Sequence, residues 1–403
     1  MSKSNETTPN VPTLRFREFT DSWTLIPIKK MLRFQNGINA DSTKYGKGIK
    51  YISVSDILNN QYITYDCIKG LIDIDEKTFN KFIVEYGDIL FQRSSETFED
   101  IGRANVYLDK EHSATFGGFV IRGKKISDYN PLFFRYLLCT HNARKQTVRM
   151  GAGAQHYNIG QEGLEKICLY FPCLQEQQKI SDFLSAIDNK IAAQNKIISK
   201  YETLIKGISC DYFSKQPNHI AKLKDLIIKG KAGGTPSSTV AEYYNGDIPF
   251  LSISDMTKQG KYVEFTEKHI SENGLANSSA WIVPSNSLIL SMYASVGLVC
   301  INKVPLATSQ AMFSMVLKDC NMLDYIYYYL NFFRETQIHR LLETGTQSNI
   351  NADTVRDIEI PFYSNILVFV KTLQAIENRL NNEKDMLSRL MDLKTYLLSS
   401  LFI

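Results

Sequence analysis

Long apolar runs are absent from this sequence of 403 residues. No stretch of about 18 consecutive apolar residues occurs, so we expect no membrane-spanning helix. The N-terminal stretch MSKSNETTPN is polar and has no apolar core, so we expect no secretory signal. The seven cysteines form no CxxC pair. An odd number of cysteines without metal-ligand spacing favours reduced thiols and a cytoplasmic location.

The motifs of common enzyme classes are also missing. GKG at Gly46–Gly48 does not complete a P-loop, and neither GxSxG nor HExxH occurs. NPLF at Asn130–Phe133 lacks the second proline of the loop with which amino-methylating enzymes grip a flipped base. No glycine-rich turn suits S-adenosylmethionine or a dinucleotide, and the six histidines have no ligand spacing. We therefore expect no catalytic residue, metal site or cofactor on this chain.

The composition that is present is that of an ordinary globular protein. Apolar residues make up 44% of the chain and charged residues 22%, as in proteins with a substantial core. The length predicts two or three domains. The net charge of +4 is compatible with nucleic-acid binding but does not require it.

The sequence contains a long internal repeat. IKYISVSD at Ile49–Asp56 matches IPFLSISD at Ile248–Asp255, and LSAIDNKI at Leu184–Ile191 matches LQAIENRL at Leu373–Leu380. Further matching segments follow in the same order in both halves. Two copies of so long a unit predict a duplicated domain pair, because a solenoid has more and shorter repeats.

Each copy begins with short β-type runs bounded by Gly, Asn, Asp and Pro. These runs are YISVS, FIVEYGDILF and GGFVIRG in the first copy, and WIVPSNSLILSMY and AMFSMVL in the second. A helical segment follows in each copy, at Leu132–Met150 and Leu323–Glu343. We expect α+β domains that consist largely of sheet.

Each copy ends in a heptad pattern of apolar residues. In the first copy the pattern falls on Ile180, Leu184, Ile187, Ile191, Gln194, Ile198, Tyr201, Ile205, Ile208 and Tyr212. In the second it falls on Phe369, Leu373, Ile376, Leu380, Glu383, Leu387, Leu390, Lys394, Leu397 and Leu401. The polar fifth position either fixes the register or is a tolerated break. Because long helices need a partner, we expect the two to pair antiparallel, with approximate two-fold symmetry.

Three segments resemble those of the specificity (S) subunits of type I restriction–modification systems. They are PTLRFREFTDSW at Pro12–Trp23, PCLQEQQKI at Pro172–Ile180 and GGTPSSTVAEYYNGDIPFLSISD at Gly233–Asp255. The resemblance covers nearly the whole chain in the family's order. The first copy departs from it, since RFQNGINADSTKYGKGIKYISVSD at Arg33–Asp56 lacks GGTPS. The second helix is preceded by IPFYSNILVFV at Ile360–Val370, without P-x-L-x-E-Q.

The resemblance implies two mostly-β target recognition domains joined by two long antiparallel coiled-coil helices. It implies a non-catalytic subunit that binds double-stranded DNA, each domain reading one half of a bipartite, asymmetric site. The helices would set the spacer and dock two methylation (M) subunits, through which restriction (R) subunits join. S-adenosylmethionine, ATP and Mg would serve those partners. The expected parts are a partly disordered lead-in (1–19), the first recognition domain (20–171), the central helix (172–216), the second recognition domain (217–362) and the C-terminal helix (363–403).

Candidate DNA contacts are polar loop residues where the copies diverge or a strand ends. Forked donors and acceptors read bases, whereas Lys, Arg, Ser and Thr also position phosphates. In the first domain the candidates are Lys44, Tyr45, Lys47, Arg93, Ser94, Ser95, Arg103, Gln155, His156 and Tyr157. In the second they are Lys231, Thr235, Ser237, Ser291, Tyr293, Ser295, Thr346, Gln347, Ser348 and Asn349. Arg93 aligns with Met292, so a base that Arg93 reads belongs to the first half-site only.

Weaker candidates and other functions stay open. Arg144, Lys145 and Arg149 share a helix and either touch phosphate or form an ordinary solvated face. The chain could also be a stand-alone, two-headed DNA-binding regulator, whose helical surface should be polar throughout. A third interpretation is an adaptor that joins proteins through its coiled coil and binds no nucleic acid.

Overall fold

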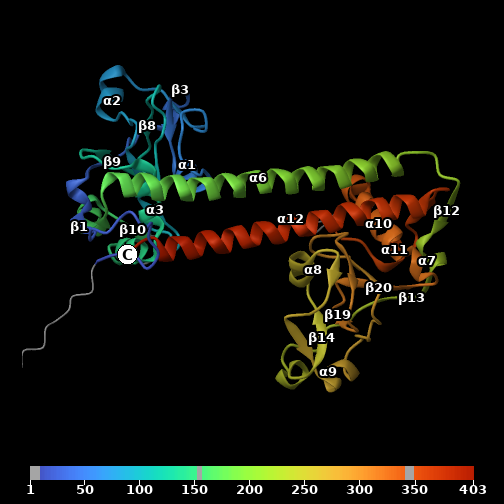
Figure 1. Ribbon diagram of the computed structural model, residues 1–403. Helices are drawn as coiled ribbons and strands as arrows, with labels where there is room; N and C mark the ends of the chain where they lie inside the picture. The colour runs from blue at the N-terminus through green and yellow to red at the C-terminus, as the bar shows by residue number, and fades with distance from the viewer. Residues whose placement is uncertain (1–9, 152–156, 341–348) are drawn as a thin grey trace, which may run out of the picture. The chain divides into compact units, whose positions relative to one another are not determined.

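The computed structural model describes residues 10–151, 157–340 and 349–403. The chain divides into two compact units (Figure 1). The first comprises the chain up to Lys196 together with Asp385–Ile403, and the second comprises Ile197–Lys384. Two long helices, α6 (Leu174–Phe213) and α12 (Ile366–Ser400), contribute to both units. In the described ranges, no helix is long and apolar enough to cross a membrane.

The strand-rich part of the first unit, which we call the first head, spans residues 24–171. Its central antiparallel sheet has the order β2-β9-β5-β7 and a second sheet the order β4-β3-β8. The strands are β1 (Thr24–Pro27), β2 (Leu32–Asn36), β3 (Tyr45–Ile52), β4 (Leu71–Ile72), β5 (Ile89–Gln92), β6 (Ser94–Ser95), β7 (Ala104–Val106), β8 (Thr115–Phe116), β9 (Val120–Lys125), β10 (Tyr157–Asn158) and β11 (Cys168–Phe171). The helices are α1 (Val54–Asn59), α2 (Glu76–Lys81), α3 (Pro131–Cys139), α4 (His141–Arg149) and α5 (Gln161–Glu165).

The second head spans residues 219–362 and repeats this topology. Its sheets have the orders β13-β20-β17-β18-β15 and β16-β14-β19. The strands are β12 (His219–Lys222), β13 (Ile227–Ala232), β14 (Ile248–Leu251), β15 (Tyr262–Val263), β16 (Lys268–Ile270), β17 (Leu288–Ser291), β18 (Val299–Asn302), β19 (Ala307–Thr308), β20 (Met312–Leu317) and β21 (Glu359–Phe362). The helices are α7 (Leu223–Leu226), α8 (Ile253–Gln259), α9 (Glu272–Ala276), α10 (Leu323–Thr336) and α11 (Ala352–Arg356).

The duplication predicted from the sequence is confirmed in the main strand pairs, although the central sheet of the second head has a fifth strand, β15. β3 pairs in parallel with β8, and β14 pairs in parallel with β19. Each head is closed by an antiparallel pair of its first and last strands, β1 with β11 and β12 with β21. The predicted α+β fold with two long helices is confirmed as well.

The repeated segment S-x-S-D begins a helix in both heads, whereas a strand, YISVS, was predicted over it in the first copy. Ser53 and Ser252 begin α1 and α8 as N-caps. The backbone N–H of Ser53 donates to Asp56 at 2.8 Å, and that of Ser252 donates to Asp255 at 2.9 Å. Both are capping boxes, which satisfy amide groups that the first helical turn leaves unpaired. The β-type run YISVS therefore ends as a strand at Ile52.

The helical segments of the heads are also shorter than predicted. Leu132–Met150 is divided into α3 and α4 because Thr140 is extended and accepts a bond from Ala143 N at 3.4 Å as an N-cap. In the second head, α10 ends at Thr336. Both α3 and α10 bury an aromatic face in the core of their head.

The heptad pattern predicts the buried side of both long helices correctly. Every position of the two patterns is buried or half-buried, whereas most positions between them are exposed. The polar fifth position of α6, Gln194, is only 6% exposed. Burying one stripe of side chains along each helix stabilises helices of this length, which would be marginal alone.

Within each unit the two long helices run in opposite directions, as predicted. In the first unit, Leu184 near the start of α6 lies in one apolar cluster with Leu397 near the end of α12. In the second unit, Tyr212 at the end of α6 stacks on Phe369 at the start of α12, with ring centroids 3.9 Å apart.

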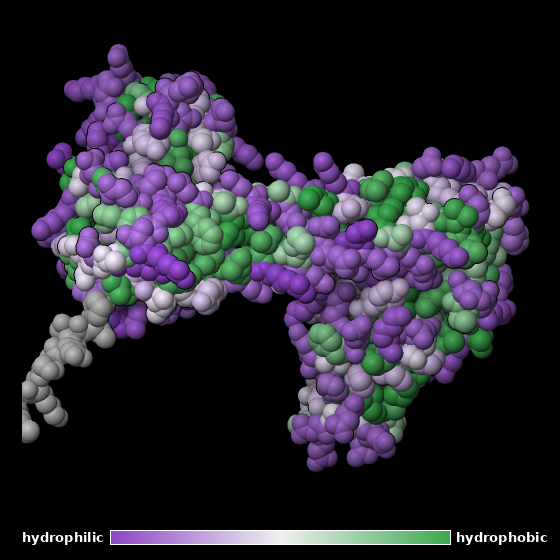
Figure 2. Space-filling view, in the orientation of Figure 1, coloured by the Kyte–Doolittle hydropathy of each residue, from purple (hydrophilic) through white to green (hydrophobic). Residues whose placement is uncertain are grey.

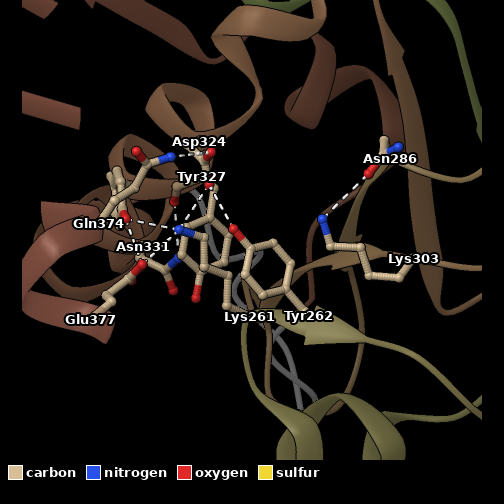
Figure 3. A network of polar contacts seen from close by, with 10 residues as sticks. Lys261, Tyr262, Asn286, Lys303, Asp324, Tyr327, Asn331, Gln374 and Glu377 are labelled. Atoms are coloured by element: carbon tan, nitrogen blue, oxygen red, sulfur yellow. Dashed lines mark hydrogen bonds and ion pairs between the residues drawn. The ribbon is translucent and has the colours of Figure 1, made fainter. Parts of the chain in front are cut away.

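The repeated octet on the long helices holds a carboxylate against a tyrosine of the head. In the first unit, Tyr136 of α3 donates a hydrogen bond of 2.7 Å to Asp188 of α6. In the second unit, Tyr328 of α10 donates one of 2.6 Å to Glu377 of α12. Glu377 is part of the network of polar contacts shown in Figure 3. Asp188 and Glu377 occupy the same position of LSAIDNKI and LQAIENRL. The octet therefore repeats because each head docks on its helix through the same pair.

The described part of the N-terminal lead-in packs against the long helices of the first unit. Arg15 donates from Nε to Glu176 at 2.8 Å, and the Glu176 side chain is 1% exposed. Leu14 N donates to the carbonyl oxygen of Ser400 at 2.9 Å. The motif PTLRFREF thus contacts both α6 and α12.

Candidate nucleic-acid interface

Three loops meet at one end of the central sheet in each head. In the first head they follow β2 and β5 and join β8 to β9, at residues 37–41, 93–97 and 117–119; we call them the first edge. In the second head they follow β13 and β17 and join β19 to β20, at residues 233–237, 292–297 and 309–311; we call them the second edge. Loops at the end of a rigid sheet are suited to recognition, because they vary without disturbing the fold.

A glycine fixes the first loop of each edge. Gly37 N donates to Val120 O at 3.1 Å, and Gly233 N donates to Met312 O at 3.1 Å. A Cβ atom would lie 2.0 Å from the carbonyl oxygen of Gly117 if placed at Gly37, and 2.0 Å from that of Thr308 if placed at Gly233. Only glycine permits this close approach. The first copy lacks GGTPS, but Gly37 of its FQNG performs the same task.

The second loop of each edge begins at equivalent residues, Arg93 and Met292. Arg93 N donates to Phe119 O at 2.9 Å, and Met292 N donates to Ala311 O at 2.7 Å. The alignment of Arg93 with Met292 made from the sequence is therefore confirmed. The two edges share one backbone framework and differ in the side chains that it carries.

Lys44, Tyr45 and Lys47 lie beside the first edge at the start of β3. The Tyr45 hydroxyl accepts a long hydrogen bond of 3.4 Å from Ala40 N, which brings the tyrosine to the loop after β2. Lys44 is exposed, and Lys47 is exposed with an ion pair of 3.2 Å to Asp73.

The ladder between β6 and β10 brings together residues that are far apart in sequence. Ser95 pairs with Tyr157, and Ser94 pairs with Asn158, to whose side chain the Ser94 hydroxyl also donates. Ser94 and Tyr157 are half-buried, and Ser95 is buried. The five candidates outside the described residues are Gln155, His156, Thr346, Gln347 and Ser348.

The two candidate arginines of the first head differ in their electrostatic partners. Arg103 is exposed and pairs with Asp100 at 2.6 Å. A hydrogen bond from Thr97 and the Arg103 guanidinium lower the pKa of Asp100, which keeps this pair charged. Arg93 makes only a long bond of 3.4 Å, from Nη1 to Gly118 O, and has no ion pair among the described residues. Arg93 therefore has the more available donors.

The candidates of the second edge fall into exposed and buried groups. The exposed ones are Lys231, Thr235, Ser237, Tyr293 and Ser295. Ser291 is fully buried, donates to Ser295 O at 2.7 Å and accepts from Leu298 N at 3.0 Å. Its hydroxyl shapes the loop from within. Asn349 lies beside this loop, because the next residue, Ile350, donates from N to Met292 O at 3.1 Å.

Backbone strain marks the same loop of the second edge. Ala294 and Ser295 have positive φ angles of 39° and 51°, in the left-handed region that ordinary side chains disfavour. Each such residue costs of order 1 kcal/mol, and such residues gather at functional sites. Tyr293 and Ser295, on either side of Ala294, are both exposed.

Sequence reasoning missed Asn39, Phe119 and Gln310. Phe119 is 69% exposed on the first edge. Gln310 is exposed on the second edge, where its side-chain oxygen accepts a bond from the Thr235 hydroxyl. GGF at the start of the run GGFVIRG and SQA at the start of AMFSMVL carried a signal, because they hold different residues at the same place of the repeat. Of the weaker helical candidates, Lys145 is exposed, whereas Arg144 bonds the carbonyls of two loop residues, at 2.8 and 2.7 Å.

Among the described residues, no group of His, Cys, Asp and Glu side chains could hold a metal ion. The edges thus offer exposed hydrogen-bonding and cationic groups on rigid backbones. Such groups can bind phosphates and the edges of bases.

Comparison with known sequences identifies both copies of the repeat. The family described as "Type I restriction modification DNA specificity domain" matches residues 23–203 and again residues 217–384. A similar curated protein is the type I restriction enzyme HindI specificity subunit of Haemophilus influenzae, 23% identical over 86% of this chain and 92% of that protein. Another is the MjaIX specificity subunit of Methanocaldococcus jannaschii, 30% identical over 36% of this chain and 34% of that protein.

Solved structures share the fold over nearly the whole chain. The type I restriction–modification S subunit from M. genitalium aligns with a TM-score of 0.58 and 14% identity, covering 98% of this chain and 99% of that one. A chain from work on complex assembly and conformational transition of the type I R-M system aligns with a TM-score of 0.57 and 13% identity, covering 94% and 97%.

Proposed function

The chain belongs to the type I restriction–modification DNA specificity family, and on that premise we propose how it works. It is the non-catalytic subunit that binds double-stranded DNA and selects the sequence. Each head reads one half of a bipartite, asymmetric site, and separate subunits methylate and cleave. S-adenosylmethionine, ATP and Mg serve those partners rather than this chain.

One observation carries this proposal: the two edges have the same backbone framework and different side chains. Equivalent hydrogen bonds from Arg93 N and Met292 N hold the framework in place. Equal frameworks present residues to DNA in equal ways, whereas unlike side chains select unlike bases. The site that such a chain reads is therefore split and asymmetric.

The long helices offer two similar docking surfaces for one kind of partner. When the octet alignment is continued along the helices, Ile197 of α6 aligns with Met386 of α12, and Leu204 aligns with Leu393. All four are exposed, at 39, 47, 54 and 43%. Figure 2 shows apolar surface over α6 among hydrophilic residues. A repeated apolar stripe suits two copies of one methylation subunit, and restriction subunits join through these. A regulator that works alone should not expose such a stripe.

The helices also set the unread spacer between the half-sites in this proposal. α6 spans 40 residues without a break. Inserting four residues near Asn195 adds about 6 Å of helix, which should lengthen the spacer by one or two base pairs. An unchanged spacer in the methylated sequence would show that the helix is not the ruler.

The function is tested by mapping methylated adenines in DNA from cells that carry this chain and its methylation subunit. We expect one split motif, which is lost when either head is exchanged. A gel shift of the chain with and without the methylation subunit separates the other interpretations. Sequence-specific DNA protection by the assembled complex excludes an adaptor, and equal discrimination by the chain alone would favour a regulator.

The docking surfaces are tested separately by L204D and L393D. Each variant should lower the amount of methylation subunit bound per chain, from two toward one, in analytical ultracentrifugation. T203D changes an exposed neighbour of Leu204 and should keep both partners. Retention of both partners by the double variant L204D/L393D would place the docking surfaces elsewhere.

A further inference from the structure

The two edges carry different forked side chains at one equivalent position. This position, which we call the spot, lies at Gly118 in the first head and at Gln310 in the second. In the first head Arg93 reaches this spot, since its Nη1 lies 3.4 Å from the Gly118 carbonyl oxygen. In the second head the residue equivalent to Arg93 is Met292, which is 3% exposed and offers no donor there. The spot is held instead by Gln310, the counterpart of Gly118.

Backbone hydrogen bonds establish that Gly118 and Gln310 are equivalent. The residues that follow them, Phe119 and Ala311, both accept a bond from the second loop of the edge. A Cβ atom at Gly118 would lie 1.6 Å from Asn39 Oδ1, so in the first head the Asn39 side chain takes the place from which the Gln310 side chain extends in the second. The first edge thus supplies Arg93 from its second loop, beside Asn39 of its first loop, whereas the second edge supplies Gln310 from its third loop.

Both groups retain free hydrogen-bonding capacity. The Arg93 guanidinium has five N–H donors, of which only one contacts Gly118. The Gln310 side chain is exposed, and its oxygen accepts from the Thr235 hydroxyl. That bond fixes the plane of the amide and leaves both its N–H donors and a second lone pair of the oxygen for a ligand.

A guanidinium and a carboxamide select different purines. Arginine donates two bonds to O6 and N7 of guanine in the major groove. Glutamine donates to N7 of adenine and accepts from its N6 amino group. A buried methionine at the equivalent place makes neither pair.

We propose that this spot reads guanine in the first half-site through Arg93 and adenine in the second half-site through Gln310. The inference rests on the proposed function, since it needs each head to face the major groove of its half-site. It assigns specificity to one residue of each head and links the base read to the loop that supplies the group.

The test is methylation of a randomised DNA library by the chain assembled with its methylation subunits, followed by sequencing. Arg93→Met introduces the residue that the second head has at the equivalent position. It should remove the preference for guanine at one position of one half-site. Gln310→Ala should do the same for one adenine of the other half-site. Each preference should fall about tenfold or more, and the other half-site should not change.

Two controls keep the result specific. K124A and K258A remove a half-buried lysine of the first head and an exposed lysine of the second, both ion-paired and away from the edges, and should leave the motif unchanged. Arg93→Lys keeps the charge but not the fork, and should weaken the guanine preference less than Arg93→Met does, because lysine also donates to O6 and N7 of guanine. The combined exchange M292R/Q310G should turn the adenine preference into one for guanine.

The outcomes separate the two levels of the argument. If the unaltered complex methylates no split motif, the proposed function fails. If it does, and Arg93→Met and Gln310→Ala leave the motif unchanged or alter positions other than one guanine and one adenine, this inference fails. Thermal melting of each variant shows whether the exposed change at Gln310 and the change at Arg93 leave the fold intact.

Discussion

The two heads dock on the long helices with the same acid and tyrosine but with a different cation. In the first unit, Lys394 of α12 pairs with Asp188 at 2.6 Å. In the second, Lys261 precedes β15 in the head itself and pairs with Glu377 at 2.7 Å and with Asp324 at 2.8 Å (Figure 3). The first cation joins helix to helix, whereas the second joins head to helix.

The two units thus share the acidic position of the octet and differ in the element that supplies its cationic partner. Burial by itself would lower the pKa of Lys261, but the carboxylates of Glu377 and Asp324 outweigh it and raise the pKa above its usual value. The lysine therefore stays charged between two acids. A buried charge needs such partners, because removing one leaves the others unpaired.

Loss of Lys261 should have the largest effect on stability. Lys261→Met leaves two carboxylates facing each other, and should cost about 3–5 kcal/mol of unfolding free energy. Lys394→Met leaves a single carboxylate and should cost less. Urea unfolding of the purified chain measures both. Lys384→Met removes an exposed lysine that forms an ion pair with Glu202. Because both side chains are about half accessible to solvent, the free energy of unfolding should change little. A greater loss for Lys394→Met would break the comparison.

Removing the docking tyrosines should have the next largest effect. Tyr136→Phe and Tyr328→Phe each delete a hydrogen bond to a carboxylate, worth about 1.5–3 kcal/mol. We expect the larger loss for Tyr136→Phe, because Asp188 is more buried than Glu377, 5% against 20% exposed. Y262F, which removes a long bond of 3.3 Å to Asp324, is the control in urea unfolding. Equal losses at all three tyrosines would contradict this ranking.

Alkaline pH should weaken the second network. The pKa values of Lys261 and Tyr328 are raised in the folded chain, for Tyr328 by burial and by the Glu377 carboxylate. Above about pH 10 the unfolded chain releases these protons while the folded chain keeps them, so stability falls as pH rises. Urea midpoints between pH 8 and 11 should fall less steeply for Glu377→Gln, which removes one cause of both shifts. A parallel fall in the variant would exclude this network as the source.

The smallest effect should come from the capping boxes, which the heads share. Ser53→Ala and Ser252→Ala each leave helix N-terminal amides unpaired and should cost about 1 kcal/mol. Equal losses of unfolding free energy in the two variants would support the comparison of the heads, because the capping boxes have the same sequence pattern and the same structure in both. Urea unfolding checks this. S55A replaces a serine outside the boxes that only accepts from Asn59, and should cost less.

Local regularities made much of the fold predictable. The heptad pattern located the buried stripe of α6 and α12, because packing repeats every three to four residues along a helix. The sequence repeat alone aligned Arg93 with Met292. Ser291 was expected to face solvent, but it ends a strand that is buried on both faces, where no alternation marks the inward side.

Other features could not be found this way. Gln310 and Thr235 lie 75 positions apart and meet only because β19, β20 and β13 converge. The first capping box was predicted as a strand end because the run YISVS alternates as a strand does. Even so, the pattern of Ser followed three residues later by Asp is a capping signal.

By itself the sequence determined that a unit occurs twice, that each copy ends in a long amphipathic helix, and which family it resembles. These conclusions follow from matching sequence segments and from the period of the apolar residues, both of which can be recognised within short stretches of the chain. Only the tertiary structure decided which lysine neutralises each octet carboxylate and which loop supplies the forked group at each edge. Those choices depend on contacts between distant residues, where ion pairing and close backbone approach are set by the packing of sheets and helices.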